Sequence, residues 1–343
     1  MKALILEEYG RLVYGEVPDP PVGPQEVLVQ VKACGICGSD VHGVDGSTGR
    51  RRPPIVMGHE ASGVIAQVGT EAAEWKSGDR VTFDSTIYCG KCRFCRRGEV
   101  NLCDDRSVLG VSCDEYRRDG AFAEYIAIPE RILYRIPDEL SFEHAAMVEP
   151  LSVAFHAVGR IPISVNDTAV VLGAGMIGLL AVQVLRAAGC GTIIAVDLEE
   201  NRLDLARGLG ADVGLKADAC DVVEEVRERS DGRGADLAFE AVGMPQTVEM
   251  AVQCLRKGGS LALVGNLSPT VQLPLQAVVA REISLYGSYA ARGEYPACLD
   301  MIARGAVKLE PLISAAAPLS EGAAWFERLC SKEPGLMKVI LRP

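Results

Sequence analysis

A run of thirty residues, "TAVVLGAGMIGLLAVQVLRAAGCGTIIAVD" from Thr168 to Asp197, restricts the fold more than any other part of the sequence. It has the pattern of a strand, a glycine turn, a helix and a second strand. Further apolar runs follow in "DLAFEAV", "SLALVG" and "ISLYGS", with helical patterns such as "PQTVEMAVQCLRKGG" between them. Strands that alternate with helices imply a parallel sheet with right-handed crossovers. We therefore predict one doubly wound α/β domain over residues 156–290.

The glycine turn of this domain has the spacing G-x-G-x-x-G. In that motif the first glycine allows a tight turn, the second lets the backbone approach a pyrophosphate, and the third lets the helix pack on the sheet. Asp197 ends the second strand, where a carboxylate binds the adenosine ribose hydroxyls and repels a 2′-phosphate. This favours NAD over NADP, although Arg202 nearby weakens the exclusion. The alternative is a turn that serves helix packing only. The predicted cofactor residues are Gly173, Gly175, Met176, Ile177, Gly178, Asp197 and Arg202.

The first part of the chain has a different texture and is rich in short strand patterns. "EVLVQVKACG" alternates, with Val27, Val29 and Val31 on one face, and "ASGVIAQVG" and "RVTFDS" are further strands between turns. The last fifty or so residues are too few for a third domain, so we expect them to fold back onto the first. The predicted domains are residues 1–155 with 291–343, and residues 156–290.

Composition excludes several classes of partner. The chain of 343 residues has a formal net charge of −11, which disfavours binding to nucleic acid. No stretch approaches the roughly 20 apolar residues of a membrane span, and "MKALILEEYG" does not have the pattern of a signal peptide. We therefore expect a cytoplasmic protein without a membrane partner, whose thiols stay reduced. Its twelve cysteines are then metal ligands or buried small side chains rather than disulfides.

Four of these cysteines lie within "YCGKCRFCRRGEVNLC". Cys89, Cys92, Cys95 and Cys103 fall on one short loop, with Gly90 able to provide a turn. Four thiolates satisfy the closed tetrahedral shell of a structural zinc ion, which leaves no position for substrate. Paired disulfides are the main alternative. We predict a structural zinc site.

A catalytic zinc ion would leave one position open and would take its ligands from separate segments. Candidate ligands are Cys37 in "ACGICGSDVHG", His59 and Glu60 in "MGHEASG", and Glu149 in "MVEPLSVAFHA". Taken singly, each has an ordinary explanation: a buried cysteine, a core histidine or a helix cap. The residue types alone leave both interpretations open.

Taken together, these segments resemble the zinc-containing medium-chain dehydrogenases over nearly the whole chain. "GHEASGVIAQVG" from Gly58 to Gly69 matches that family's zinc signature, and "CGICGSD", the four-cysteine loop and the glycine motif follow in the family's order. The resemblance implies a GroES-like, β-rich catalytic domain and a Rossmann NAD-binding domain. It also implies a catalytic zinc ion held by Cys37, His59 and a carboxylate of Glu60 or Glu149. Glu149 stands where many alcohol dehydrogenases carry a third ligand cysteine, as in the branch that acts on polyols, sugars and threonine.

By this resemblance the protein is expected to oxidise a secondary hydroxyl of a polyol or sugar alcohol, free or phosphorylated, to a ketone. Zinc would stabilise the alkoxide while hydride passes to NAD. Ser39 and His42 match the family's proton relay. Alternatively, Ser39 caps a helix that begins at Asp40, and His42 faces solvent.

Several alternatives remain open at this level. Oxidation of a 2-amino-3-hydroxy acid such as threonine is one, although threonine-type members usually have Thr at the position of Ser39. The run Arg50 to Arg52 could reach a substrate phosphate or form a solvated loop. Sorbitol-type members carry Arg-Tyr where this chain has Ala290-Ala291. A zinc- and NAD-binding sensor without turnover is a further class. We expect a homodimer or homotetramer, with "SLYGSYA" as an edge strand at the interface.

Overall fold

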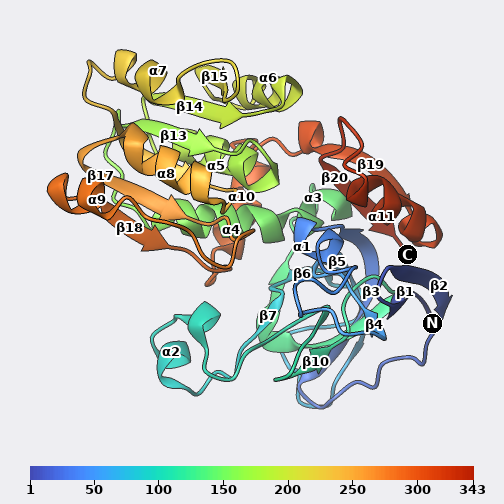
Figure 1. Ribbon diagram of the computed structural model, residues 1–343. Coiled ribbons are helices and arrows are strands. Elements are labelled where there is room, and N and C mark those ends of the chain that lie inside the picture. The colour runs from blue at the N-terminus through green and yellow to red at the C-terminus, as the bar shows by residue number, and fades with distance from the viewer. The chain divides into compact units, whose positions relative to one another are not determined.

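The structure is a computed structural model that describes residues 1–343. The chain divides into two compact units (Figure 1). Unit 1 comprises Met1–Glu149, Arg292–Arg304 and Leu309–Pro343, and unit 2 comprises Pro150–Ala291 and Gly305–Lys308. Helix α4 (Val148–Gly159) begins at the end of one unit and continues into the other.

Unit 2 is a six-stranded parallel sheet with strand order β15-β14-β13-β16-β17-β18. The strands are β13 (Thr168–Leu172), β14 (Thr192–Asp197), β15 (Val213–Lys216), β16 (Ala235–Glu240), β17 (Leu255–Leu263) and β18 (Ser284–Gly287). Helices α5 (Met176–Ala187) and α6 (Glu200–Gly208) pack together, and so do α7 (Val222–Glu228), α8 (Pro245–Cys254) and α9 (Leu275–Ala280). Right-handed crossovers place these two sets on opposite faces. The predicted doubly wound fold is confirmed, with the strand order of a dinucleotide-binding sheet.

One helix of unit 2 is shorter than its sequence pattern suggests. The pattern "PQTVEMAVQCLRKGG" extends to Gly259, but α8 ends at Cys254 and β17 begins at Leu255. Leu255 is already extended, with φ −74° and ψ 149°, and it pairs with Ala235 of β16. Strand pairing therefore ends the helix a full turn before the glycines do.

Unit 1 is rich in β-structure, as predicted. Its seven-stranded sheet has the order β12-β6-β5-β3-β20-β19, with β11 also paired to β3. These strands are β3 (Glu26–Gly35), β5 (Glu60–Val68), β6 (Arg80–Phe83), β11 (Tyr125–Pro129), β12 (Leu133–Arg135), β19 (Ile313–Pro318) and β20 (Lys338–Arg342). Val27, Val29 and Val31 alternate into the core, each at most 2% exposed. The C-terminal strands β19 and β20 thus complete a sheet that the N-terminal segment begins.

Shorter elements surround this sheet. The remaining strands are β1 (Lys2–Glu8), β2 (Arg11–Glu16), β4 (Ile55–Val56), β7 (Thr86–Ile87), β8 (Ser107–Val108), β9 (Val111–Ser112) and β10 (Arg117–Arg118). The helices are α1 (Gly38–Val41), α2 (Arg93–Arg96), α3 (Phe142–Ala146), α10 (Tyr295–Ala303) and α11 (Gly322–Cys330). Short 3₁₀ helices are η1 (Val100–Leu102), η2 (Glu130–Ile132), η3 (Glu310–Leu312) and η4 (Leu319–Glu321).

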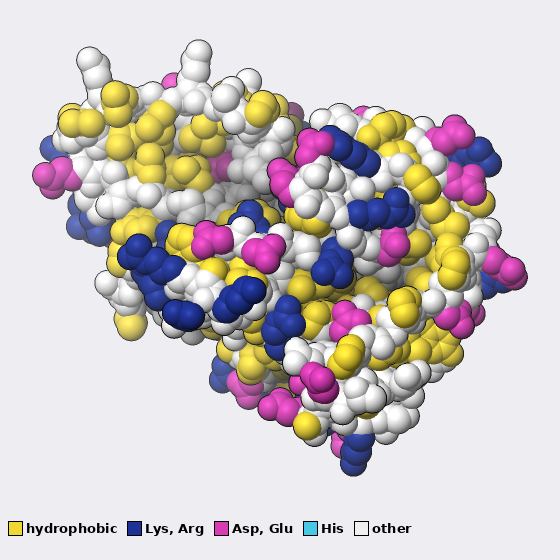
Figure 2. All heavy atoms as spheres, turned by 90° about the horizontal axis from the view of Figure 1, so that it is seen from below, with side chains coloured by type: hydrophobic (Ala, Val, Ile, Leu, Met, Phe, Trp, Pro, Cys, Tyr) yellow, Lys and Arg dark blue, Asp and Glu magenta, His cyan; other side chains and the backbone are white.

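The surface carries mixed charge. On the face drawn in Figure 2, acidic and basic side chains are interspersed and hydrophobic side chains form small groups. None of the helices combines the length and the apolar character that crossing a membrane would require.

We predict that Gly178→Ala lowers the free energy of unfolding by about 1–3 kcal/mol or more, because overpacking a tight contact is destabilising. A Cβ at Gly178 would lie 1.8 Å from the carbonyl oxygen of Gly173. The matched control is Gly208→Ala at the end of α6, where a Cβ meets no atom within 4 Å. That change should leave stability equal or slightly higher. Urea unfolding midpoints measure both, and equal midpoints for the two variants would contradict the packing role of Gly178.

Candidate metal and cofactor sites

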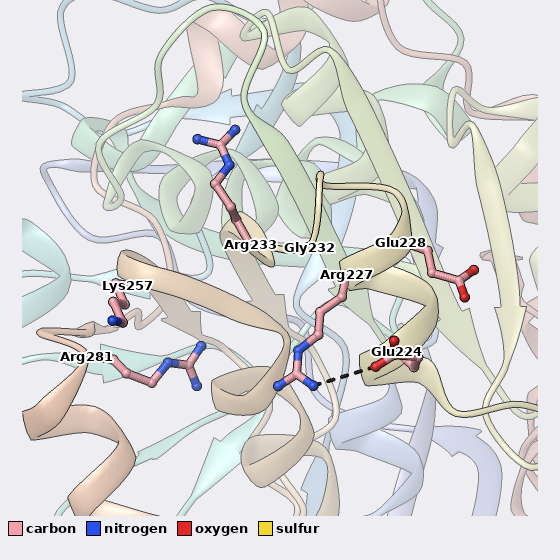
Figure 3. A pocket seen from close by; sticks show the side chains of 7 residues that line it. All are labelled: Glu224, Arg227, Glu228, Gly232, Arg233, Lys257 and Arg281. Atoms are coloured by element: carbon pink, nitrogen blue, oxygen red, sulfur yellow. Dashed lines mark ion pairs between the residues drawn. The ribbon is translucent and has the colours of Figure 1, made fainter.

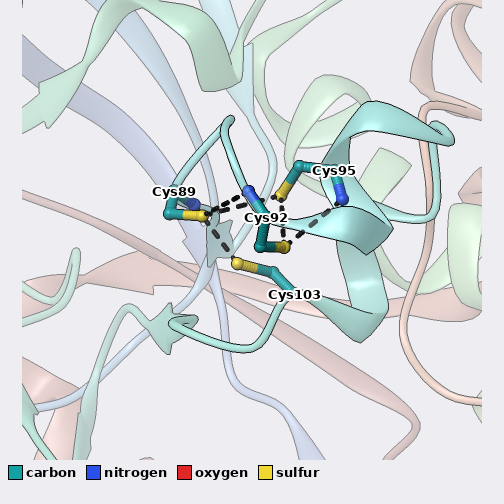
Figure 4. Close-up of side chains that lie close together, drawn as sticks. All are labelled: Cys89, Cys92, Cys95 and Cys103. Carbon is teal, nitrogen blue, oxygen red and sulfur yellow. Dashed lines mark hydrogen bonds between the residues drawn. The ribbon is translucent and has the colours of Figure 1, made fainter.

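The four predicted cysteines of the loop come together in unit 1 (Figure 4). The Sγ atoms of Cys92 and Cys95 are 3.5 Å apart, and those of Cys89 and Cys95 are 4.0 Å apart. The backbone N–H of Cys95 donates to Cys92 Sγ at the start of α2, and the backbone N–H of Cys89 donates to Cys103 Sγ. All twelve cysteines are free thiols, so the paired-disulfide alternative is not what the structure shows.

This arrangement fits a zinc ion. Four sulfur atoms at about 2.3 Å from a tetrahedral zinc ion would lie about 3.8 Å from one another, which is within the range of the observed separations. Backbone N–H groups, that of Cys95 first, lower the pKa of Cys92 to about 6, whereas burial raises the pKa of Cys95 to about 12. A divalent cation would stabilise all four thiolates together.

A second set of donors forms at the end of the large sheet of unit 1. Donor atoms of Cys37, His59 and Glu60 all lie within 4.8 Å of one another. The pairing of β3 with β5 sets Gly35 opposite Glu60, so the residues that follow β3 and precede β5 meet at one point. A Cβ at Gly35 would lie 2.3 Å from Glu60 Oε2, so glycine leaves room for this carboxylate where it meets Lys338. One thiolate, one imidazole and one carboxylate are the donor types of a catalytic zinc site with an open position.

Glu60 also has a buried cationic partner that the sequence did not reveal. Lys338, the first residue of β20, places Nζ 2.6 Å from Glu60 Oε2 and donates to the carbonyl oxygen of Ile36 at 3.0 Å. Both side chains are almost fully buried, at 1% and 3% exposure. Burial lowers the pKa of Lys338, but the negative groups around it, Glu60 first, together outweigh burial and raise that pKa. Glu60 therefore has a buried cation as its partner.

His59 is oriented by a second buried pair that was also missed. Its Nδ1 lies 3.4 Å from Asp40 Oδ1, and the same oxygen is 3.0 Å from Arg51 Nη2. Burial lowers the pKa of His59, but the nearby Asp40 and Cys37 outweigh burial and hold the pKa well above its usual value. A carboxylate on the Nδ1 side of the ring would leave Nε2 for a metal.

The arginine run is therefore not a uniform solvated loop. Arg51 is 4% exposed and forms an ion pair with Asp40. Arg52 is exposed and pairs with Asp114, with Nη1 2.5 Å from Oδ1. Arg50 is exposed and lies 3.4 Å from the hydroxyl of Tyr116. The interpretation as a solvated loop is wrong for Arg51, because a buried aspartate attracts it inward.

Glu149 lies near this site but not in the tight donor group. Ser85 donates its hydroxyl to Glu149 Oε1 at 3.1 Å. Desolvation raises the pKa of Glu149 to about 7, opposed by the charge of His59 and assisted by that of Glu60. Burial likewise raises the pKa of Asp84 to about 7. Glu149 and Asp84 thus have raised pKa values in the same region of unit 1. A bound cation would stabilise their charged forms, so this region is suited to a metal ion.

Ser39 and His42 both lie on the short segment around α1. The N-cap of α1 is Cys37 and not Ser39, so the capping alternative for Ser39 is wrong. Both residues are exposed within the structure, and Ser39 Oγ accepts a hydrogen bond from Arg51 Nη2 at 3.4 Å. Ser39 lies within α1 and His42 is its C-cap, two and five residues after Cys37.

In unit 2 the glycine motif connects β13 to α5. Gly173 has φ +93°, and Gly178 packs directly on it. Gly175 is the N-cap of α5, which Met176 and Ile177 begin, and no atom lies within 4 Å of a Cβ built there. The backbone N–H groups at this helix start have no side-chain cap, which fits a pyrophosphate.

Asp197 lies at the end of β14 beside this turn. Its carboxylate accepts hydrogen bonds from the backbone N–H of Ala174 at 2.7 Å and of Leu198 at 2.8 Å. Arg202 Nη1 is 3.8 Å from Asp197 Oδ2. The structure thus brings the acid and the glycine turn together, with Arg202 at the rim.

Comparison with known proteins adds an independent line of observation. The family model for the alcohol dehydrogenase GroES-like domain matches residues 23–138, and the model for zinc-binding dehydrogenases matches residues 177–304. Sorbitol dehydrogenase of Bacillus subtilis is 35% identical over 348 residues, which cover 100% of this chain and 97% of that protein. L-threonine 3-dehydrogenase of Symbiobacterium thermophilum is 36% identical over 341 residues, covering 96% and 93%. A zinc-binding dehydrogenase from Sinorhizobium meliloti, solved with NADP, has a TM-score of 0.91 and 32% identity over 100% of this chain and 99% of that one.

We predict that Lys338→Met lowers the free energy of unfolding by about 3–5 kcal/mol, because it leaves a buried carboxylate without its cation. The double variant Lys338→Met with Glu60→Gln removes both charges and should recover much of that loss. Urea unfolding of the two variants provides the comparison. A double variant that is no more stable than Lys338→Met would show that the ion pair is not the cause.

Proposed function

Because this chain belongs to the zinc-binding alcohol dehydrogenase family, we propose that it is an NAD-dependent enzyme that oxidises the secondary hydroxyl of a polyol or sugar alcohol to a ketone. The observation that carries the proposal is the group of Cys37, His59 and Glu60, in which a carboxylate completes the donor set. Similarity to a sorbitol dehydrogenase over the whole chain supports the substrate class.

In this proposal Cys37, His59 and Glu60 hold the catalytic zinc ion, with Glu149 as a second carboxylate nearby. The four-cysteine loop holds the structural zinc ion. Bound zinc would supply Lewis-acid polarisation of the substrate hydroxyl, and NAD would accept the hydride. Lys338 pairs with Glu60, and Asp40 lies beside Nδ1 of His59.

The proton released from the substrate hydroxyl needs a path to water. We propose that Ser39 passes it to His42, because a hydroxyl can accept and donate at once and an imidazole titrates near neutral pH. The exposure of both residues supports a path that ends in solvent.

For the cofactor, Gly173, Gly175 and Gly178 would allow the pyrophosphate to approach the start of α5, where Met176 and Ile177 lie. Asp197 would bind the ribose hydroxyls and disfavour a 2′-phosphate. The position of Asp197 supports NAD over NADP, although Arg202 lies beside it and one solved relative carries NADP.

Free polyols fit this chain better than phosphorylated ones, because Arg51 and Arg52 are already paired with aspartates. Threonine oxidation is the second candidate, favoured by a relative at 36% identity. A sensor without turnover is less consistent with a complete donor set. We also propose a cytoplasmic location, on the basis of twelve free thiols, which cell fractionation would test.

The expected activity is NADH formation with a free polyol, at a higher kcat/KM with NAD than with NADP. A panel of free polyols, phosphorylated polyols and threonine, followed by NADH absorbance, measures it. Turnover on threonine alone would replace the polyol proposal with the second candidate. If no compound of the panel supports NADH formation while zinc is bound and NAD binding is intact, the family assignment holds but the proposed substrate class is wrong.

Two variants separate the metal sites in the same assay. Cys37→Ser should reduce turnover by a factor of about 1,000 or more, since Lewis-acid stabilisation is lost, while NAD binding and folding persist. Cys92→Ser should lower thermal stability and zinc content first. Full activity of Cys37→Ser with one zinc ion per chain would contradict the assignment of the catalytic site.

We further propose a homodimer or homotetramer that assembles through the edge of the unit 2 sheet. Strand β18 pairs only with β17, so its outer edge carries unpaired backbone groups. Beside it, Leu275 and Val279 of α9 are 63% and 67% exposed, and Leu267 is 55% exposed. A strand edge next to exposed apolar side chains is suited to pairing with a second copy.

Sedimentation should therefore show a species of twice the 36.6 kDa chain mass or a multiple of it. Val279→Asp should shift that species toward the monomer, because a charge in an apolar interface is unfavourable. A wild-type protein that sediments as a monomer at micromolar concentration would overturn the proposal.

A further inference from the structure

Unit 2 contains a basic hollow that the proposed activity does not use (Figure 3). It has a volume of about 600 Å³, within the range of roughly 300–1,000 Å³ typical of small-molecule sites. Four cations and two acids line it: Arg227, Arg233, Lys257, Arg281, Glu224 and Glu228. The excess of positive charge contrasts with the net charge of −11 of the whole chain.

This hollow lies at the opposite edge of the sheet from the glycine motif. Gly173 directly follows the carboxyl end of β13, and the strands of this sheet are parallel. Arg233 precedes the first residue of β16 by two positions, Lys257 is the third residue of β17, and Arg281 precedes β18 by three. The hollow therefore lies at the amino ends of these strands, away from the predicted dinucleotide phosphates.

The cations that line it are poorly neutralised by the protein. Arg233, Lys257 and Arg281 form no ion pair within 4.0 Å, and the pair of Arg227 with Glu224 is long, at 3.7 Å. Asp236 is the acid that interacts electrostatically with Arg233, but its carboxylate already accepts a hydrogen bond from Arg256 Nε at 2.5 Å.

Two of the guanidinium groups face one another across the hollow. Figure 3 shows Arg227 and Arg281 with their guanidinium groups turned toward each other, and the Glu228 carboxylate on the side away from Arg281. Arg281 is half-buried, and its Nη1 donates to the carbonyl oxygen of Val252 at 3.2 Å. Burial lowers the pKa of Arg281, and the charge of Arg227 lowers it further. Like charges held this close are stabilised by a bound anion.

We propose that this hollow is a binding site for a small molecule that carries phosphoryl groups. Arginine forks and a lysine ammonium are the groups that bind phosphate oxygens most strongly in proteins. Two or more phosphoryl charges match the four cations that line the hollow. The site is independent of the zinc centre and of the substrate class proposed above.

Calorimetric titration with inorganic pyrophosphate tests this site. The zinc-loaded protein is saturated with NAD, so that the glycine motif is occupied, and ionic strength is held constant with sodium chloride. We expect saturable binding that weakens by about tenfold or more in the double variant Arg233→Gln with Lys257→Gln, because each lost charge-assisted hydrogen bond is substantial. Both side chains are exposed and form no ion pair, so the variant should fold.

The matched control is Lys308→Gln, an exposed lysine of the same unit that forms no ion pair and lies outside the hollow. It should bind pyrophosphate as the wild type does. Zinc content measured after each titration excludes removal of the metal. Equal affinity in the wild type and the double variant would place the anion elsewhere and overturn the proposal. Absence of saturable binding to the wild type would also overturn it.

Discussion

The buried contact between Glu60 and Lys338 is the interaction on which the zinc-site geometry of unit 1 depends. A carboxylate at 1% exposure is unfavourable unless a cation meets it, and Lys338 provides that cation from the last strand of the chain. For this contact to form, β3 must lie between β5 and β20, and Gly35 must leave space for the carboxylate. The order β5-β3-β20 in the sheet therefore also determines where the metal donor Glu60 lies.

The two metal sites follow different physical rules. The four cysteines of the loop need only local turns, and backbone N–H groups of the same loop stabilise their sulfur atoms. The donors Cys37, His59 and Glu60 meet only when two strands of the sheet pair in register. Loss of the sheet would therefore destroy the second site, whereas the first could form from its own segment. This difference is consistent with a structural role for the four-cysteine site and a catalytic role for the site of Cys37, His59 and Glu60.

Much of the fold could be predicted from sequence because periodicity reports burial directly. The alternation of Val27, Val29 and Val31 and the glycine motif at Gly173 both correspond to what the structure shows. The end of α8 could not be predicted from the sequence. The helix ends because Leu255 pairs with Ala235, and that is a contact between separate segments of the chain. Lys338 was missed for the same reason, since 278 residues separate it from Glu60. Asp40 was within reach, three residues after Cys37, but an aspartate there is equally typical of a short helix start.

Zinc-edge anomalous scattering from crystals of the zinc-loaded protein would locate both metal ions directly. Two peaks per chain are expected, one within the four cysteines and one bound by Cys37, His59 and Glu60. A single peak at the four cysteines would contradict the catalytic assignment. A second peak bound by Glu149 instead of Glu60 would show that Lys338 retains Glu60 as its own partner.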